Sequence, residues 1–210
     1  MLNKILLVVL FASLSATSAQ RGVIDDFKII DSTLCVSYHI DELLDEKSIE
    51  ALQRGVQSEV VHKIQLWQQK SFINPLEKEL NHHIKVFYDN WEKKFKLETP
   101  DGYRLTPHIE TVKRQCAFVE YFPLVPLSEL ERNKNYYVSV QVTFQLISAE
   151  SYNALSDVFA GEKKKSDAKE KKQGGFTSVL VNLLGLGDRE FSLKSGSFII
   201  TETGQFEYAQ

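Results

Sequence analysis

The chain has 210 residues and a formal net charge of −3, with 25% charged and 11% aromatic residues. This length is ample for one domain with a full hydrophobic core. The mildly acidic balance argues against a nucleic-acid-binding protein, so any attraction to an anionic surface has to be local.

Residues 1–19 have the layout of a secretory signal peptide. Lys4 provides a positive start, residues 5–12 an apolar stretch, and residues 13–19 a small, polar end. The apolar stretch is shorter than the roughly 20 residues that span a bilayer. A buried N-terminal helix is the alternative. The pattern predicts export to the periplasm or the medium, cleavage near Ala19, and no transmembrane helix in the mature chain.

After residues 1–19, the composition divides the chain into five parts. They are a β-sandwich domain at 20–160, a Lys-rich loop or linker at 161–175, a short amphipathic helix at 176–187, a final strand at 188–202 that returns to the sandwich, and a tail at 203–210.

Alternation of apolar and polar residues predicts the strands. It is clearest over 136–146, where the apolar row is Tyr136, Val138, Val140, Val142, Phe144 and Leu146. The opposite, solvent-facing row is Tyr137, Ser139, Gln141, Thr143 and Gln145. The segments 33–40 and 60–69 repeat this alternation.

The middle of the chain predicts a β-hairpin. Pro100, Asp101 and Gly102 have the chemistry of a tight turn, between arms at Trp91–Glu98 and Tyr103–Leu105. Phe87, Trp91, Phe95 and Leu97 share one parity, so we expect them on one face of a strand. A further strand is expected at 190–200, with a bulge at Gly196.

Three short helices are expected. The first, at 45–55, has Asp45 as its N-cap and Gly55 past its end. The others lie at about 107–116 and 148–159. Long amphipathic strands joined by short helices predict a mainly β protein: an antiparallel β-sandwich of immunoglobulin-like or open-barrel character, with two to four short helices.

In their order, these segments resemble a bacterial family of exported proteins, domain-of-unknown-function family 4390. The residues that carry the resemblance are Leu52 and Gly55 at the end of the first helix, and Pro126, Leu127, Leu130 and Tyr136 before and at the long strand. The resemblance covers about residues 25–200, and the Lys-rich insertion departs from it. It implies an envelope protein without assigned activity, and it provides no catalytic residues.

Patterns typical of catalytic or metal sites are missing from the sequence. The five histidines, at positions 39, 62, 82, 83 and 108, have no metal-ligand spacing, and no cofactor loop or Gly-x-Ser-x-Gly turn occurs. The aromatic residues of the middle third are interpreted as β-core, with a ligand-binding face as the alternative. They are Phe87, Trp91, Phe95, Tyr103, Phe118, Tyr121 and Phe122.

Two cysteines, Cys35 and Cys116, permit one disulfide in an oxidising compartment, and two buried thiols are the alternative. Lys113 and Arg114 lie close to Cys116 in sequence, which is the setting that would activate a thiol. A small buried thiol is the favoured interpretation there.

The stretch at 162–172 has six lysines and three acids and is too polar to pack on its own. On the helix expected after it, one side is apolar. The candidate contact residues for a partner or a membrane surface are Lys163, Lys164, Lys165, Phe176, Val179, Leu180, Leu183 and Leu184. Docking of this helix on its own domain is the favoured interpretation, and contact with a partner or a membrane is the alternative.

Together, these features predict a non-enzymatic binding or structural domain of the cell envelope, with an unknown envelope protein or a membrane surface as partner. Two alternatives remain. One is a peripheral membrane protein attached through 162–187. The other is an enzyme whose site is assembled only in three dimensions.

Overall fold

The structure, a computed structural model, describes residues 22–147 and 188–209. In these residues the chain forms two antiparallel sheets and two α-helices, which confirms the prediction of a mainly β, antiparallel architecture. The smaller sheet contains, in this order, β1 (Gly22–Ile30), β2 (Thr33–Ile40) and β7 (Phe118–Pro126).

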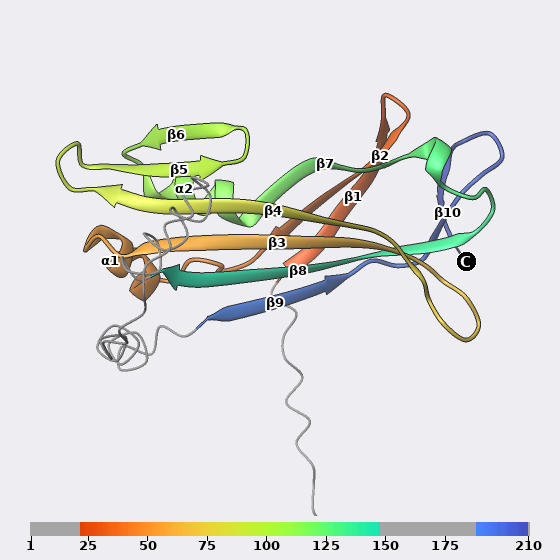
Figure 1. The fold of residues 1–210 in the computed structure, drawn as a ribbon, viewed down its shortest axis with the longest axis horizontal. Coiled ribbons are helices and arrows are strands. Elements are labelled where there is room, and N and C mark those ends of the chain that lie inside the picture. Colours follow the sequence, from red (N-terminus) through yellow and green to blue (C-terminus); the bar gives the residue numbers. More distant parts are fainter. Residues whose placement is uncertain (1–21, 148–187, 210) are drawn as a thin grey trace, which may run out of the picture.

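The larger sheet is built on two long strands, β3 (Gln57–Gln68) and β8 (Asn135–Ile147), which pair along their whole length. Its other strands are β4 (Leu76–Asp89), β5 (Lys94–Thr99), β6 (Gly102–Thr106), β9 (Arg189–Lys194), β10 (Phe198–Ile200) and β11 (Phe206–Tyr208). The order is β11-β10-β8-β3-β4-β5-β6, and β9 also pairs with β8 (Figure 1).

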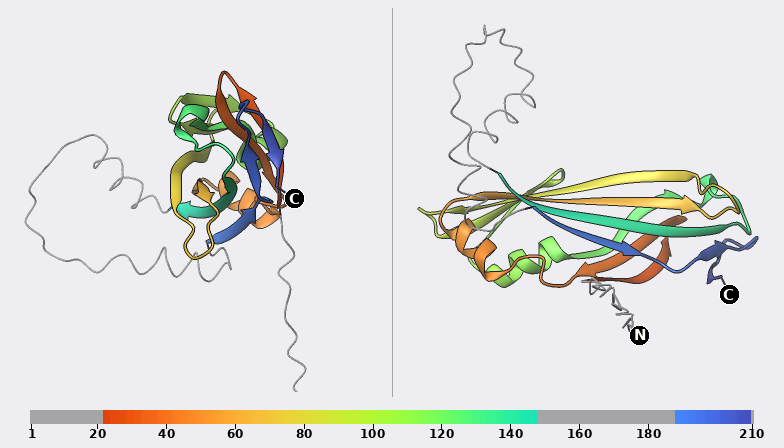
Figure 2. Two further views of the ribbon diagram at one scale, coloured as in Figure 1. Left: turned by 90° about the vertical axis from the view of Figure 1, so that its right-hand side faces the viewer. Right: turned by 90° about the horizontal axis from the view of Figure 1, so that it is seen from below.

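The two sheets and the helices form distinct layers. The smaller sheet and both helices lie along one face of the long, twisted larger sheet (Figure 2). Among the described elements, none covers the opposite face of β3, β8 and β9, which we call the outer face.

The core lies between the two sheets. It is built from alternate side chains because successive residues of a strand point to opposite faces. The inward row of β8 is Tyr136, Val138, Val140, Val142 and Phe144, none of them more than 2% exposed. From the smaller sheet, Leu34, Val36 and Tyr38 pack against it with no exposed surface. Each such side chain stabilises the fold by about 1.5–3 kcal/mol relative to its exposed state.

The helices α1 (Glu46–Gln53) and α2 (Ile109–Ala117) lie where the sequence predicts them, and a short 3-10 helix, η1 (Leu127–Glu129), follows β7. The predicted N-cap of α1 is confirmed, because Oδ1 of Asp45 accepts the Ser48 N–H at 2.9 Å. Arg189 of β9 reaches the same cap, with Nη1 3.2 Å from Oδ2 of Asp45. The chain that follows residue 188 is thereby tied to α1.

The predicted hairpin is confirmed as β5 and β6, but the expectation that Phe87 and Trp91 share a face with Phe95 is wrong. Phe87 belongs to β4, and the turn after Asp89 resets the alternation before β5 begins. Asp89 Oδ1 accepts the N–H groups of Trp91 and Glu92 and holds this turn. Trp91 is consequently 97% exposed.

The C-terminal region also differs from the expectation. Residues 190–200 form two strands rather than one bulged strand, because the segment around Gly196 leaves β9 and leads to β10. The expected tail at 203–210 contains β11, which pairs with β10. The expected helices at 148–159 and 176–187 and the Lys-rich stretch at 161–175 lie outside the described residues.

Candidate functional site

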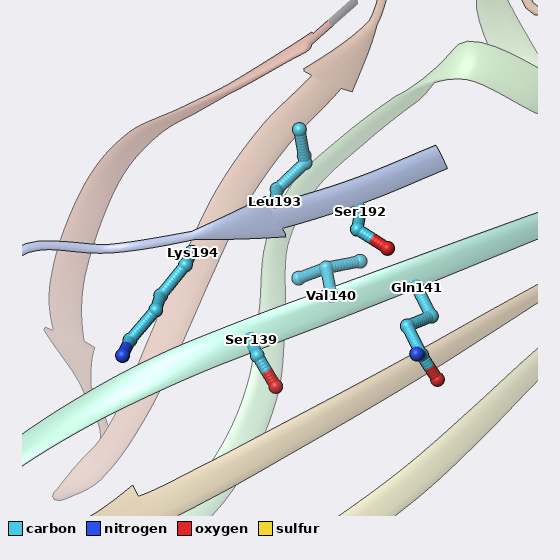
Figure 3. Close-up of a pocket in the computed structure, with 6 residues that line it drawn as sticks. All are labelled: Ser139, Val140, Gln141, Ser192, Leu193 and Lys194. Atoms are coloured by element: carbon cyan, nitrogen blue, oxygen red, sulfur yellow. The ribbon is translucent and has the colours of Figure 1, made fainter. Parts of the chain in front are cut away.

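A shallow trough runs along β8 on the outer face. Two adjoining hollows, of about 320 Å³ and about 190 Å³, share Gln141 and Ser192 as lining residues. The outward side chains that line them, which we call the outer trough, are Val61, Lys63, Ser139, Gln141, Thr143, Glu190, Ser192 and Lys194. Figure 3 shows Leu193 directed away from Ser139, Gln141 and Lys194, toward the core.

An aromatic stack closes one end of the outer trough. Trp67 of β3 lies opposite Tyr137 of β8, with ring centroids 6.3 Å apart and ring planes within 7° of parallel. The Lys194 ammonium lies 4.0 Å from the centroid of the Tyr137 ring, in a cation–π contact. Both rings are half-buried, so each keeps a surface that a ligand can reach.

The polar groups beside the stack are held in place by one another across three strands. Trp67 Nε1 donates to Ser139 Oγ at 3.1 Å, and Ser139 Oγ donates to Gln65 Oε1 at 3.3 Å. Gln65 Nε2 in turn donates to Glu79 Oε2 of β4 at 2.6 Å. A surface ordered before binding loses little side-chain entropy when a ligand arrives.

The strand pairing explains why these residues meet. Because β3 and β8 are in register over their whole length, the outward row of each strand lies beside that of the other. The polar row of β8 follows from its alternation in the sequence. Trp67 and the β9 residues were not identified from the sequence as part of a site. Trp67 could have been found, because a large aromatic residue at an outward position of a strand is a signal of a binding surface.

The contact residues proposed from the sequence fall in the part of the chain that the structure does not describe. Lys163, Lys164, Lys165, Phe176, Val179, Leu180, Leu183 and Leu184 all lie outside the described residues, and their role stays a prediction. Of the aromatic residues interpreted as core, Phe95 is buried, but Tyr103 and Phe118 are 68% and 56% exposed.

The cysteines do not form the disulfide that the sequence permits. Cys35 and Cys116 are both free and buried, as in the alternative of two buried thiols. Burial raises the pKa of Cys116 to about 12, so its thiol is neutral at physiological pH. The nearby Lys113 and Arg114 do not activate it, because Cys116 has no exposed surface.

A histidine is among the polar residues buried in the core. His62 on β3 has no exposed surface, and its Nδ1 lies 3.0 Å from the hydroxyl of Tyr38. Burial and the neighbouring His82 lower the pKa of His62 to about 3. Burial also raises the pKa of Tyr38. The pair is therefore uncharged at neutral pH and sealed from substrate.

A third hollow, of about 410 Å³, lies apart from the outer trough, between α2 and the connection from β2 to α1. At its rim Phe118 stacks on His39, whose Nδ1 lies 2.8 Å from Asp25 Oδ1. Lys113 in its wall pairs with Glu110 at 2.9 Å. Lys113 and Glu110 thus bind one another, and this hollow has no aromatic stack like that of Trp67 and Tyr137, which makes it a weaker candidate than the outer trough.

The described ranges contain neither a metal-ligand cluster nor a membrane-spanning helix. No three His, Cys, Asp or Glu side chains at 22–147 or 188–209 are placed to hold a metal ion. Within the same ranges, no helix combines the length and the apolar character needed to cross a membrane.

Comparison with known proteins gives one match. The model of the family described as "Domain of unknown function (DUF4390)" matches residues 20–147, which end with the last residue of β8. No curated protein and no solved structure matches the chain.

Proposed function

Because the chain belongs to the DUF4390 family, whose description states no activity, we propose a function from the chain's own surface. The protein is an exported, non-enzymatic binding domain of the cell envelope, and it holds an extended polysaccharide along the outer trough.

The observation that carries this proposal is the open outer trough with its aromatic stack. Ligand sites combine apolar and aromatic surface with a few placed polar groups. Here Trp67 and Tyr137 provide the aromatic surface, and a row of amide and hydroxyl groups continues from them along β8. Since the trough follows a strand and no described residue closes it along its length, it suits a chain-like ligand.

The chemistry of the lining favours a neutral, hydroxyl-rich polymer. Amide and hydroxyl side chains both donate and accept hydrogen bonds, as the hydroxyls of a sugar do. Charges around the trough are balanced, with Lys63 and Lys194 against Glu79 and Glu190. This balance disfavours nucleic acid, which requires a basic surface.

Two further features support the remaining parts of the proposal. The leader pattern at 1–19 supports export, and N-terminal sequencing of the protein from a periplasmic or medium fraction should begin at Gln20. The burial of Cys116 and His62, the two groups best suited to nucleophilic or acid–base chemistry, supports binding rather than catalysis.

Co-sedimentation with insoluble cell-wall polysaccharide tests the binding. The chain from Gln20 onward should sediment with the polymer, and Tyr137→Ser should weaken binding about tenfold or more by opening the aromatic stack. Tyr103→Ser is the matched control, because Tyr103 is an exposed tyrosine on the edge strand of the same sheet. Equal losses in both variants, or no sedimentation of the unmodified chain, would show the proposal to be wrong.

A further inference from the structure

The loop between β3 and β4 exposes two large apolar side chains at its tip. Phe72 is 99% exposed and Ile73, its neighbour, is 79% exposed. At the base of the loop, Leu76 is 43% exposed. Figure 1 shows the loop projecting from the end of the larger sheet that is opposite to α1. We call residues 69–75 the hairpin tip.

The exposure of these two side chains is imposed by a well-braced loop. Asn74 Oδ1 accepts the Lys70 N–H at 2.9 Å, and Gln68 N donates to the Pro75 carbonyl at 3.0 Å. Gln69 N also donates to the Asn135 carbonyl at 2.7 Å, which joins the tip to the start of β8. A loop with these bonds presents Phe72 and Ile73 outward in a fixed position.

The charges near the tip are compatible with an anionic surface. Residues 69–75 contain Lys70 and no acid, and the adjoining residues 132–135 add Arg132 and Lys134, again with no acid. Glu77 and Glu131 stand just beyond these two segments, and Glu202 accepts a bond from Asn133 at 2.7 Å. The charges at this end therefore balance, and Lys70 is the basic group next to Phe72 and Ile73 in the chain. Basic groups near an anionic bilayer each add about 1 kcal/mol of attraction, which salt weakens.

We propose that the hairpin tip is a lipid-contact element that inserts Phe72 and Ile73 into the interfacial layer of a phospholipid bilayer. A lipid surface suits this tip better than a pocket on a partner protein does. Two adjacent apolar side chains on a projecting loop can enter a bilayer without a partner surface of complementary shape. Lys70 lies beside them, where its ammonium meets the head groups while its stem follows the apolar residues.

The hairpin tip adjoins the aromatic stack at the end of the outer trough, because Asn74 Nδ2 donates to the Tyr137 hydroxyl at 3.4 Å, but Phe72 and Ile73 themselves do not line the trough. The described chain breaks off at Ile147, at the far end of β8 from the tip, and resumes at Asp188. At about 3.3 Å per residue, the length of β8 places Ile147 about 40 Å from Asn135. The 176–187 segment lies outside the described residues, and its contribution is tested with substitutions of its own.

Vesicle flotation tests the proposal with the chain from Gln20 onward, since the described structure begins after the predicted leader. The vesicles are an equal mixture of phosphatidylcholine and phosphatidylglycerol. The unmodified chain should float with them, and the double variant Phe72→Ser/Ile73→Ser should lose about tenfold or more of this partitioning. Both side chains are exposed, so the double variant should keep its melting temperature.

Two control variants identify the element responsible. Trp91→Ser removes an equally exposed aromatic residue at the opposite end of the molecule and should float like the unmodified chain. Leu180→Ser/Leu184→Ser alters the expected helix and should also leave flotation in place. The proposal is overturned if the unmodified chain does not float, if the Phe72→Ser/Ile73→Ser chain floats equally well, or if either control abolishes flotation.

Discussion

His62 makes the stability of the sandwich sensitive to acid. Its ring is buried against Tyr38, and burial lowers its pKa from 6.5 to about 3. In the unfolded chain the same ring takes up a proton near its ordinary pKa. Because the unfolded state binds the proton more readily, stability is fully present well above pH 6.5 and is lost as the pH falls toward 3.

The size of the loss follows from the interval between these two pKa values. Each pH unit within it lowers the free energy of unfolding by about 1.36 kcal/mol, so the change from pH 8 to pH 4.5 is about 2.7 kcal/mol. Burial also lowers the pKa of the neighbouring His82, which adds a loss in the same direction. The Asp45 carboxylate contributes at lower pH, since bonds from Ser48 and the charge of Arg189 outweigh burial and hold its pKa below 3.8.

The variant His62→Gln separates this contribution from the others. Gln keeps a donor and an acceptor for the Tyr38 hydroxyl but carries no titrating group. Urea unfolding followed by tryptophan fluorescence, at a series of pH values from 8 to 4.5, should show a loss about 2.7 kcal/mol smaller in this variant than in the unmodified chain. His83→Gln, whose side chain pairs with Glu59 on the outer face, is the matched control. The reasoning is refuted if His62→Gln loses stability with acid as steeply as the unmodified chain.

Two further predictions concern the cap of α1 and the thiols. Asp45→Ala should lower the free energy of unfolding by about 0.5–2 kcal/mol, because it removes the cap bond to Ser48. Urea unfolding at pH 7 measures this loss, and Asp41→Ala, at an exposed carboxylate outside the helix, should change stability far less. Neither Cys35 nor Cys116 should react with an aromatic disulfide reagent in the folded chain, and both should react in denaturant without a reductant. A requirement for reductant would reveal a disulfide and contradict the structure.

The alternating segments were predictable from the sequence because in β3 and β8 one side of the strand faces the core and the other is partly exposed. In β2 the sequence alternates too, although both sides are buried from Leu34 to Tyr38. That pattern identifies β2, β3 and β8, and it already assigns Ser139 and Gln141 to an outward row. The strands β1 and β7 escaped prediction for a physical reason. Both form the smaller sheet with shifts in register, at Ile24/Asp26 and at Val36/Tyr38, and such shifts break the alternation.

The outer trough was only partly predictable. Its β9 wall lies more than forty residues after β8 along the chain, and no local pattern shows that the two strands pair. The exposure of Trp91 could not be predicted from the sequence either. A turn of a few residues between β4 and β5 changes whether odd-numbered or even-numbered residues face the core. The features that could not be predicted from the sequence are therefore those that depend on pairing between strands distant in the chain or on the parity change at a turn.

The central claim is that the outer trough binds the ligand, and fluorescence of Trp67 tests it most directly. The chain has two tryptophans, so Trp91→Phe leaves Trp67 at the end of the trough as the single reporter. Titration of this variant with soluble fragments of cell-wall polysaccharide should change the Trp67 emission in a saturable way, and Tyr137→Ser in the same background should shift the midpoint about tenfold or more. Binding seen by sedimentation without any change in Trp67 emission would place the ligand elsewhere and contradict the account.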